Sequence, residues 1–138
     1  MSEYIRVRVC LVIIDKGKIL LVPHYHTDVG FVQWVVPGGM LKFGETMETA
    51  AIREFFEETG FQTVITELFD ISEEILPEKH YHSITISFCG KIIKGELKHE
   101  EGHAYGVKTP KWFTMNELKA ITYHPVQVIN KAISIIKK

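Results

Sequence analysis

Residues 37–61 read PGGMLKFGETMETAAIREFFEETGF, and this stretch decides how the rest of the chain is interpreted. Helical periodicity holds within it from about residue 46 to residue 59, and Gly60 stands where a helix end favours a residue with positive φ. At about 100° of rotation per residue, three carboxylates share one arc of about 100° on this helix. They belong to Glu54, Glu57 and Glu58.

The clustered carboxylates repel one another, and two interpretations account for them. At a separation of about 6 Å the repulsion is roughly 0.7 kcal/mol in water and roughly 3 kcal/mol at an effective dielectric of 20. A fully solvated helix face tolerates that cost. Alternatively, the glutamates bind a hard divalent cation, which takes several oxygen ligands and bridges carboxylates to phosphates.

The neighbouring residues favour the cation site. A Gly38-Gly39 turn lets the backbone come close to the same ion and supplies a carbonyl ligand. Arg53 lies four residues before Glu57 and can hold a neighbouring carboxylate in place. We also expect Ala50 and Ala51, below the glutamates, to leave that surface open to a ligand.

The spacing resembles the Nudix box in full. The pattern is Gly39, five residues, Glu45, seven residues, Arg53-Glu54, Phe55, Phe56, Glu57-Glu58, Thr59, Gly60 and Phe61. The flanking segments QWVVPGG and KWFTMNEL also look like the family, so the resemblance covers most of the chain. It implies a single Nudix hydrolase domain over residues 1–138, with an α/β (α+β) fold of the α/β/α sandwich type around a mixed central sheet.

The resemblance also implies a set of site residues. Mg2+, or Mn2+ in its place, would be held by Glu54, Glu57, Glu58 and the Gly38 carbonyl. The catalytic candidates are Glu57, Glu58, Arg53 and Glu101, the last from the loop that also contains Glu100. Which of these carboxylates takes the proton from water stays open. The substrate-binding candidates are Gly39, Glu45, Tyr81 and Phe43, where the two aromatic rings have core packing as the alternative.

The family cleaves a nucleoside diphosphate linked to another group, so the expected partner is a small nucleotide substrate. Pro77 lies sixteen residues after Phe61, which slightly resembles ADP-ribose pyrophosphatases. We therefore favour ADP-ribose or a nucleotide sugar, with a nucleoside triphosphate next. The alternative is a non-catalytic nucleotide-sensing domain, which usually lacks one of the metal glutamates. Family members are often dimeric, so a homodimer is compatible with the resemblance.

Composition excludes several other classes. The chain has 16 basic and 17 acidic residues and a net charge of −1, so no global field favours nucleic acid or an anionic membrane. No segment approaches the roughly 20 apolar residues of a membrane span. Cys10 and Cys89 stand in separate apolar runs, as free buried thiols would, which suits a cytoplasmic protein.

The remaining sequence predicts strands mixed with helices. We expect a hairpin over residues 5–22, a loop over 23–31, strands over 62–75 and 82–93, and a loop over 94–110. Thr114 and Glu117 form a capping box, and Pro125 opens a last amphipathic helix. Within the second loop, residues 99–103 match the H-E-x-x-H pattern of zinc peptidases. That pattern needs a helix, which the surrounding glycines disfavour.

Overall fold

The fold is known from a computed structural model that describes residues 3–26, 30–97, 100–103 and 106–136. Within these ranges, side chains are described for all residues except those in 26–32 and 98–108. One sheet has the strand order β5-β1-β7-β6. Strand β1 runs parallel to β7 and antiparallel to β5, so this sheet is mixed. Its strands are β1 (Arg6–Val12), β5 (Gly38–Met40), β6 (Phe61–Leu76) and β7 (Tyr81–Gly95).

A second mixed sheet has the order β10-β3-β4-β11, with the short strand β2 paired to β3. Strand β11 runs parallel to β4, while the other pairs are antiparallel. Its strands are β2 (Ile14–Asp15), β3 (Lys18–His26), β4 (Gly30–Val35), β10 (Lys111–Thr114) and β11 (Tyr123–His124). A separate two-stranded sheet contains β8 (Glu100–His103) and β9 (Gly106–Lys108).

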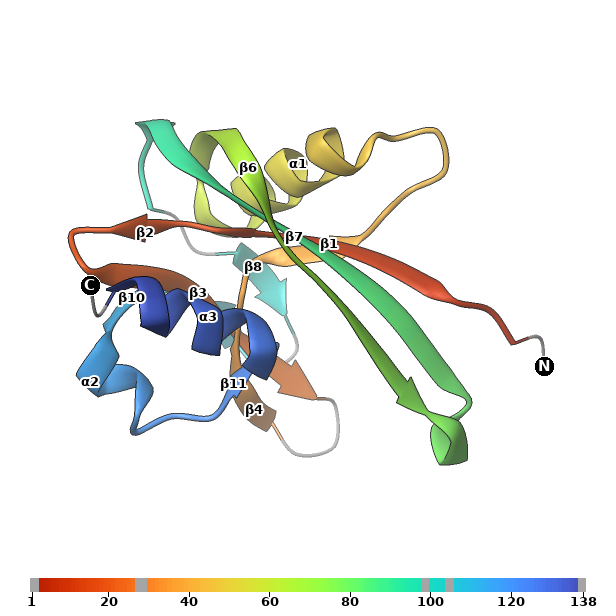
Figure 1. Ribbon diagram of the computed structural model, residues 1–138. Helices are drawn as coiled ribbons and strands as arrows, with labels where there is room; N and C mark the ends of the chain where they lie inside the picture. The colour runs from red at the N-terminus through yellow and green to blue at the C-terminus, as the bar shows by residue number, and fades with distance from the viewer. Residues whose placement is uncertain (1–2, 27–29, 98–99, 104–105, 137–138) are drawn as a thin grey trace.

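The helices are α1 (Met47–Thr59), α2 (Met115–Leu118) and α3 (Val126–Ile136). Figure 1 shows α1 on one side of β1 and β7, and α3 on the other side. Strands β6 and β7 together form a long arm that extends beyond the helices and ends at the 3-10 turn η1 (Pro77–Lys79). The predicted sandwich of helices around mixed sheets is confirmed.

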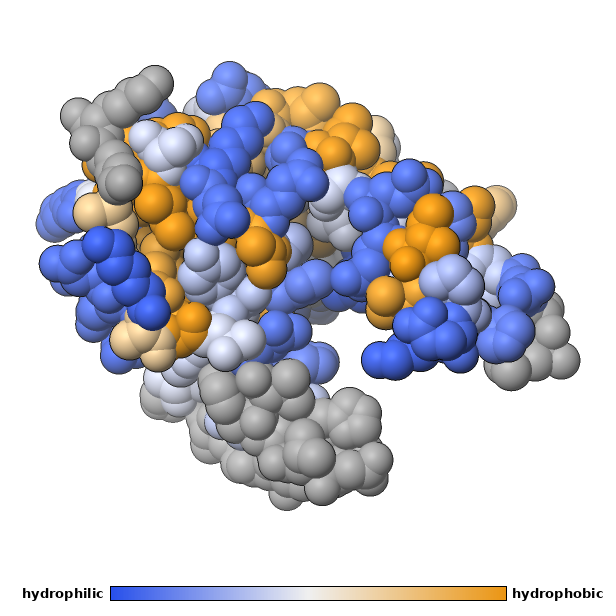
Figure 2. Space-filling model, turned by 60° about the horizontal axis from the view of Figure 1, so that its bottom comes forward, coloured by the Kyte–Doolittle hydropathy of each residue, from blue (hydrophilic) through white to orange (hydrophobic). Residues whose placement is uncertain are grey.

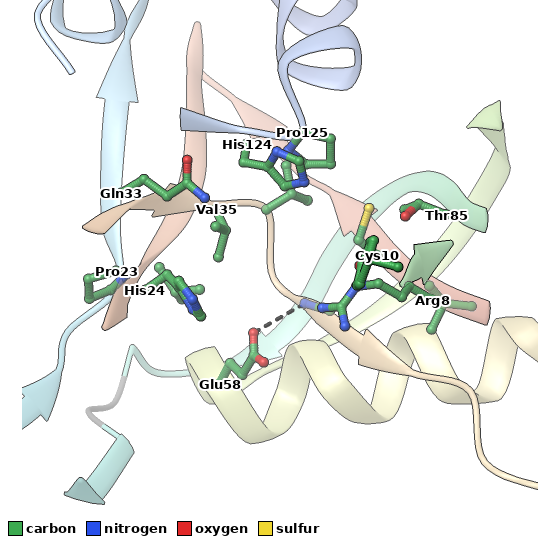
Figure 3. A pocket seen from close by; sticks show the side chains of 15 residues that line it. Arg8, Cys10, Pro23, His24, Gln33, Val35, Glu58, Thr85, His124 and Pro125 are labelled. Carbon is green, nitrogen blue, oxygen red and sulfur yellow. Dashed lines mark hydrogen bonds between the residues drawn. The ribbon is translucent and has the colours of Figure 1, made fainter. Parts of the chain in front are cut away.

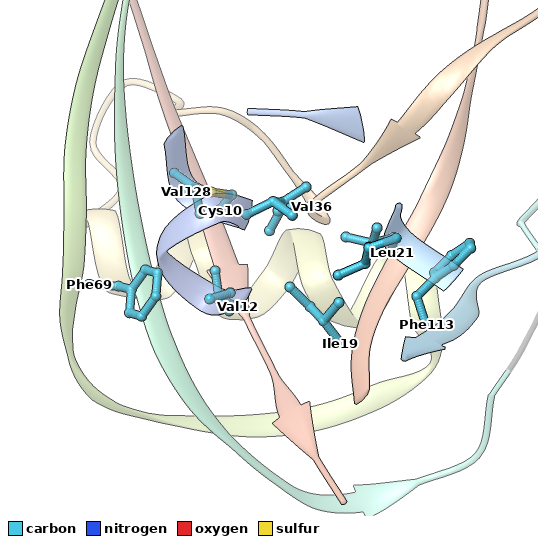
Figure 4. Packing of buried hydrophobic residues seen from close by; sticks show 11 residues of the cluster. Cys10, Val12, Ile19, Leu21, Val36, Phe69, Phe113 and Val128 are labelled. Atoms are coloured by element: carbon cyan, nitrogen blue, oxygen red, sulfur yellow. The ribbon is translucent and has the colours of Figure 1, made fainter. Parts of the chain in front are cut away.

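The alternation of side chains along β1 produces the two layers of the core, because successive strand residues point to opposite faces. Val9 and Leu11 pack with Phe55 of α1 in one cluster. Cys10 and Val12 pack in a second cluster. Figure 4 shows this cluster, which also contains residues of α3 and of the second sheet. A strand buried on both faces reads as a continuous apolar run, which the sequence shows at residues 9–13.

Several predicted elements are confirmed. Thr114 caps α2 through both hydrogen bonds of a capping box with Glu117. Helix α3 begins directly after Pro125, and its buried residues are Val128, Ile129 and Ala132. Among the described residues, no helix is long and apolar enough to cross a membrane.

Four local predictions are wrong. Residues 5–22 do not form one hairpin, because β1 pairs with β5 and β7, and within this segment only the short β2 pairs with β3. Residues 23–26 continue strand β3, and β4 already begins at Gly30, because the two strands pair as far as His26 and Gly30. Residues 100–103 and 106–108 form strands within the segment expected to be a loop. The pair Gly38-Gly39 lies in strand β5 and not in a turn, since it is paired with Cys10 and Val9 of β1.

Candidate active site

Helix α1 positions the three predicted metal ligands and is terminated as the sequence predicts. The Thr46 hydroxyl accepts a hydrogen bond from the Thr49 amide at 3.1 Å, which caps the N-terminus. Gly60 ends the helix at φ 87°, a left-handed conformation that glycine adopts without strain. Phe55 is fully buried on the face opposite the glutamates and anchors the helix on the sheet.

Arg53 connects three carboxylates. Its Nε and Nη2 atoms donate to the two carboxylate oxygens of Glu45 at 2.6 and 3.0 Å. Its Nη1 atom donates to Oε1 of Glu54 and to Oε1 of Glu57, at 2.9 Å in each case. The bond from Arg53 lowers the pKa of the Glu45 carboxyl below its usual range, and the same carboxylate raises the pKa of Arg53. The guanidinium therefore holds three carboxylates close together, which is the supporting arrangement that the sequence predicts for Arg53.

The two glycines of β5 bring backbone against this row. The Gly38 amide donates to Oε1 of Glu58 at 3.2 Å. A Cβ at Gly39 would lie 2.6 Å from Oε2 of Glu54, and a Cβ at Gly38 would lie 2.2 Å from the Val9 carbonyl oxygen. Neither glycine has a positive φ, so both are needed for close approach and not for chain reversal.

A pocket of about 350 Å³ adjoins Glu58 and Gly38. Figure 3 shows that its walls come from segments far apart in the sequence, including β1, β4, β7 and the region of β11. Predicted residue Tyr81 lines it together with Arg8, His24 and His124. The sequence held no signal for Arg8 or His124, because only the pairing of distant strands brings them to this place.

Other predicted residues lie elsewhere. The Phe43 ring is fully exposed and does not line this pocket. Glu101 lies in strand β8, and its side chain is outside the described part of the structure, as is that of Glu100. Ala50 and Ala51 are fully buried in the core, so the expectation that they leave the ligand surface open is wrong.

The H-E-x-x-H stretch does not form a helix. Its residues 100–103 are in strand β8, while His99 lies outside the described residues. In an extended strand the side chains alternate, so the helical spacing that a zinc peptidase uses is absent from residues 100–103.

The carboxylate oxygens of α1 are the ligand type that a hard divalent cation takes. No group of three acidic, histidine or cysteine side chains among the described residues converges closely enough to form a closed metal cage. Mg2+ does not need one, because it keeps several waters and is commonly held by one or two carboxylates together with substrate phosphates. Glu54 and Glu57 each use Oε1 for Arg53, and the structure describes no hydrogen bond to their Oε2 atoms. These oxygens are available as ligands.

Replacing Arg53 with lysine is expected to lower kcat by about 10- to 100-fold, because a lysine keeps the charge but loses the forked contacts. One ammonium cannot hold Glu45 at both oxygens and also bind Glu54 and Glu57. Steady-state kinetics with Mg2+ and ADP-ribose, the substrate expected from the sequence, measure the effect, and thermal melting checks the fold. A kcat equal to that of the unsubstituted chain would show that the carboxylates need no such support.

Comparisons with known proteins agree with this geometry. The NUDIX domain family model matches residues 4–131. An ADP-ribose pyrophosphatase from Methanocaldococcus jannaschii is 30% identical over 118 residues, which cover 85% of this chain and 67% of that protein. The NAD-capped RNA hydrolase NudC of Pectobacterium carotovorum is 27% identical over 116 residues, which cover 83% of this chain and 42% of that protein.

A solved structure has the same fold. The NUDIX hydrolase from Nitrosomonas europaea superposes with a TM-score of 0.80 at 23% identity, covering 94% of this chain and 86% of that one. The family match extends over almost the whole chain, and the fold places Glu58 of the box beside the pocket. This chain therefore belongs to the NUDIX family, whose members are pyrophosphohydrolases that act on phosphoric anhydrides and generally use divalent metal ions.

Proposed function

We propose that this chain hydrolyses the diphosphate linkage of a nucleoside diphosphate derivative in a Mg2+-dependent reaction, with ADP-ribose or a nucleotide sugar as the preferred substrate class. One observation supports this most directly. Arg53 of α1 holds the carboxylates of Glu54 and Glu57 on the same helix and of Glu45 just before it, while Glu58 and Gly38 line a pocket of about 350 Å³. The relative from Methanocaldococcus jannaschii, named an ADP-ribose pyrophosphatase, supports the choice of substrate.

In this proposal Glu54, Glu57 and Glu58 hold Mg2+ with the Gly38 carbonyl, and Mn2+ can substitute. The bound ion would lower the pKa of a coordinated water and neutralise charge on the diphosphate. The Gly38 amide, which donates to Glu58, keeps that carboxylate directed toward the pocket.

The other proposed roles belong to residues around this centre. Arg53 and Glu45 keep the box carboxylates in position. Glu101 remains a candidate general base beside the box glutamates. Gly39, Tyr81 and Phe43 remain candidates for substrate contact, and of these three Tyr81 lines the pocket.

A substrate panel tests the proposal. ADP-ribose, UDP-glucose, ATP and GTP are each incubated with the protein and Mg2+, and the phosphorylated products are separated by anion-exchange chromatography. We expect AMP and ribose 5-phosphate from ADP-ribose, and no products when EDTA removes the metal. Faster turnover of the triphosphates would move the substrate class to nucleoside triphosphates. Tight binding of a nucleotide without any turnover would identify a sensor domain and contradict the proposed hydrolysis.

A further inference from the structure

Arg53 is not available to contact the substrate's phosphates. Four hydrogen bonds from its guanidinium go to the carboxylates of Glu45, Glu54 and Glu57. A guanidinium has five N–H donors in a fixed plane, so these contacts use nearly all of them. A protein cation that contacts the diphosphate in addition to the metal would therefore come from outside the box.

Arg8 of β1 is placed for this role. It lines the pocket beside Glu58 and Gly38, and Figure 3 shows its side chain extending from β1 toward that pocket. Arg8 and Cys10 are two residues apart on β1 and therefore share one face of the strand, and Cys10 is paired with Gly38, whose amide donates to Glu58. Arg8, Gly38 and Glu58 thus border the same pocket.

Arg8 as a whole residue is half-buried, and its guanidinium has no partner among the described residues. In the described part of the chain it makes no hydrogen bond, ion pair or ring contact, whereas Arg6 two residues earlier lies over the rings of Tyr4 and Tyr81, at 4.7 Å from each centroid. Arginine side chains that leave bulk water are normally paired with anions. An unpaired one lining a pocket therefore indicates an anion from outside the chain.

Beyond Arg8 lies a second pocket of about 220 Å³, here named the hydroxyl pocket. The row Arg8, Thr85 and Ser72 crosses β1, β7 and β6, and both hydroxyl residues line it. Its wall also contains Ser83, Gln127 and the half-buried carboxylate Glu74. Figure 2 shows mostly hydrophilic side chains beside the concave outline between the arm and the rest of the domain.

The chemistry of the hydroxyl pocket suits a sugar better than a phosphate. Hydroxyl, amide and carboxylate oxygens accept hydrogen bonds from the hydroxyl groups of a sugar. A terminal phosphate would instead meet the charge of Glu74. Among the described residues, Arg8 is the only lysine or arginine that lines either pocket.

We propose that Arg8 binds the non-bridging oxygens of the substrate's diphosphate and that the hydroxyl pocket accepts the sugar attached to its far phosphate. This inference rests on the proposed function and extends it, because it names the residues that select sugar-linked diphosphates over nucleoside triphosphates. The nucleoside occupies the first pocket, where Val22, Pro23 and Val35 provide apolar surface and His24 and Gln33 provide polar groups.

Four variants test the assignment: Arg8→Met, Arg8→Lys, Lys94→Met and Glu74→Lys. For each, kcat and KM are measured with ADP-ribose and with ATP, and calorimetry measures binding of the α,β-methylene analogue of ADP-ribose. Arg8→Met is expected to raise KM for ADP-ribose and Kd for the analogue about 10- to 100-fold, which is the usual effect of losing a charged hydrogen bond. Arg8→Lys should give intermediate values of both constants. The control Lys94→Met also removes one positive charge, from an exposed residue of β7 that lines neither pocket, so it should change either constant about threefold or less.

Glu74→Lys tests the hydroxyl pocket separately. The added ammonium should attract a terminal phosphate, so we expect the ratio of kcat/KM for ATP to that for ADP-ribose to rise about tenfold or more. Circular dichroism and melting temperatures establish that each variant is folded. If Arg8→Met does not fold, Arg8→Lys decides the role of Arg8.

The outcomes separate this inference from the function on which it rests. If the Arg8→Met variant hydrolyses ADP-ribose as well as the unsubstituted chain does, the role of Arg8 is overturned and the proposed function stays intact. Unchanged selectivity in Glu74→Lys, or a preference of the unsubstituted chain for ATP, would overturn the sugar assignment. No turnover of any diphosphate by the unsubstituted chain would contradict the proposed function itself.

Discussion

Replacing Glu58 with glutamine is expected to lower kcat for ADP-ribose by about 1000-fold, equivalent to about 4 kcal/mol of transition-state stabilisation. The substitution keeps the size of the side chain and a carbonyl oxygen for the hydrogen bond from the Gly38 amide, which the carboxylate accepts at 3.2 Å. It removes the negative charge that a divalent cation needs. Steady-state kinetics over a range of Mg2+ concentrations measures the loss.

Glu48 provides a matched control on the same helix. It is exposed in the first turn of α1 and lines none of the pockets described above. Glu48→Gln should therefore leave kcat unchanged, although it removes the same single negative charge as Glu58→Gln does. Full activity in Glu58→Gln would remove this residue from the metal site, and an equal loss in both variants would point to a general charge effect.

Adding a methyl group at Gly38 is expected to destabilise the fold by about 3 kcal/mol, near the upper end for overpacked positions. The new Cβ would lie 2.2 Å from the Val9 carbonyl oxygen and 2.8 Å from the Cys10 Cα atom. Both are backbone atoms of a buried strand, so they cannot move aside without breaking the pairing of β1 with β5. Urea unfolding measures the change in the free energy of unfolding.

Gly39→Ala is the informative comparison, because the three atoms nearest to its Cβ would belong to the Glu54 carboxylate, at 2.6 to 2.9 Å. A side chain can rotate away, so the cost in stability should be about 1 kcal/mol or less. Activity should nevertheless fall about 10- to 100-fold, because Glu54 leaves the position in which Arg53 holds it. Equal destabilisation by the two alanines would contradict this account of why both positions are glycine.

The features that can be predicted from sequence are those that depend on neighbours along the chain. The predicted ends of helix α1 agree with the structure to within one residue. Both ends are set by local capping signals, Thr46 at the start and Gly60 at the end. The spacing of Arg53 and Glu57 on successive turns places them in contact in any regular helix. The two-sided burial of β1 follows from its apolar run in the same way.

Features that depend on pairing between distant strands cannot be predicted in this way. The two glycines of β5 resemble a turn when only their neighbours in sequence are considered. Their pairing with Val9 and Cys10 of β1 involves residues about 30 positions away, so the local sequence does not reveal it. The position of Ala50 and Ala51 on the helix suggests a ligand surface, because helical periodicity does not reveal how far the sheet extends beneath α1.

The pocket beside Glu58 is the feature that the sequence predicts least well. The carboxylate row along α1 lies within one continuous segment, residues 37–61, so its chemistry can be inferred without a structure. Arg8, Thr85 and His124 share a pocket with Glu58 only because the parallel pairing of β1 with β7, and of β4 with β11, brings four distant segments together. Local backbone geometry places the proposed metal ligands, whereas long-range strand register forms the walls of the pocket beside them.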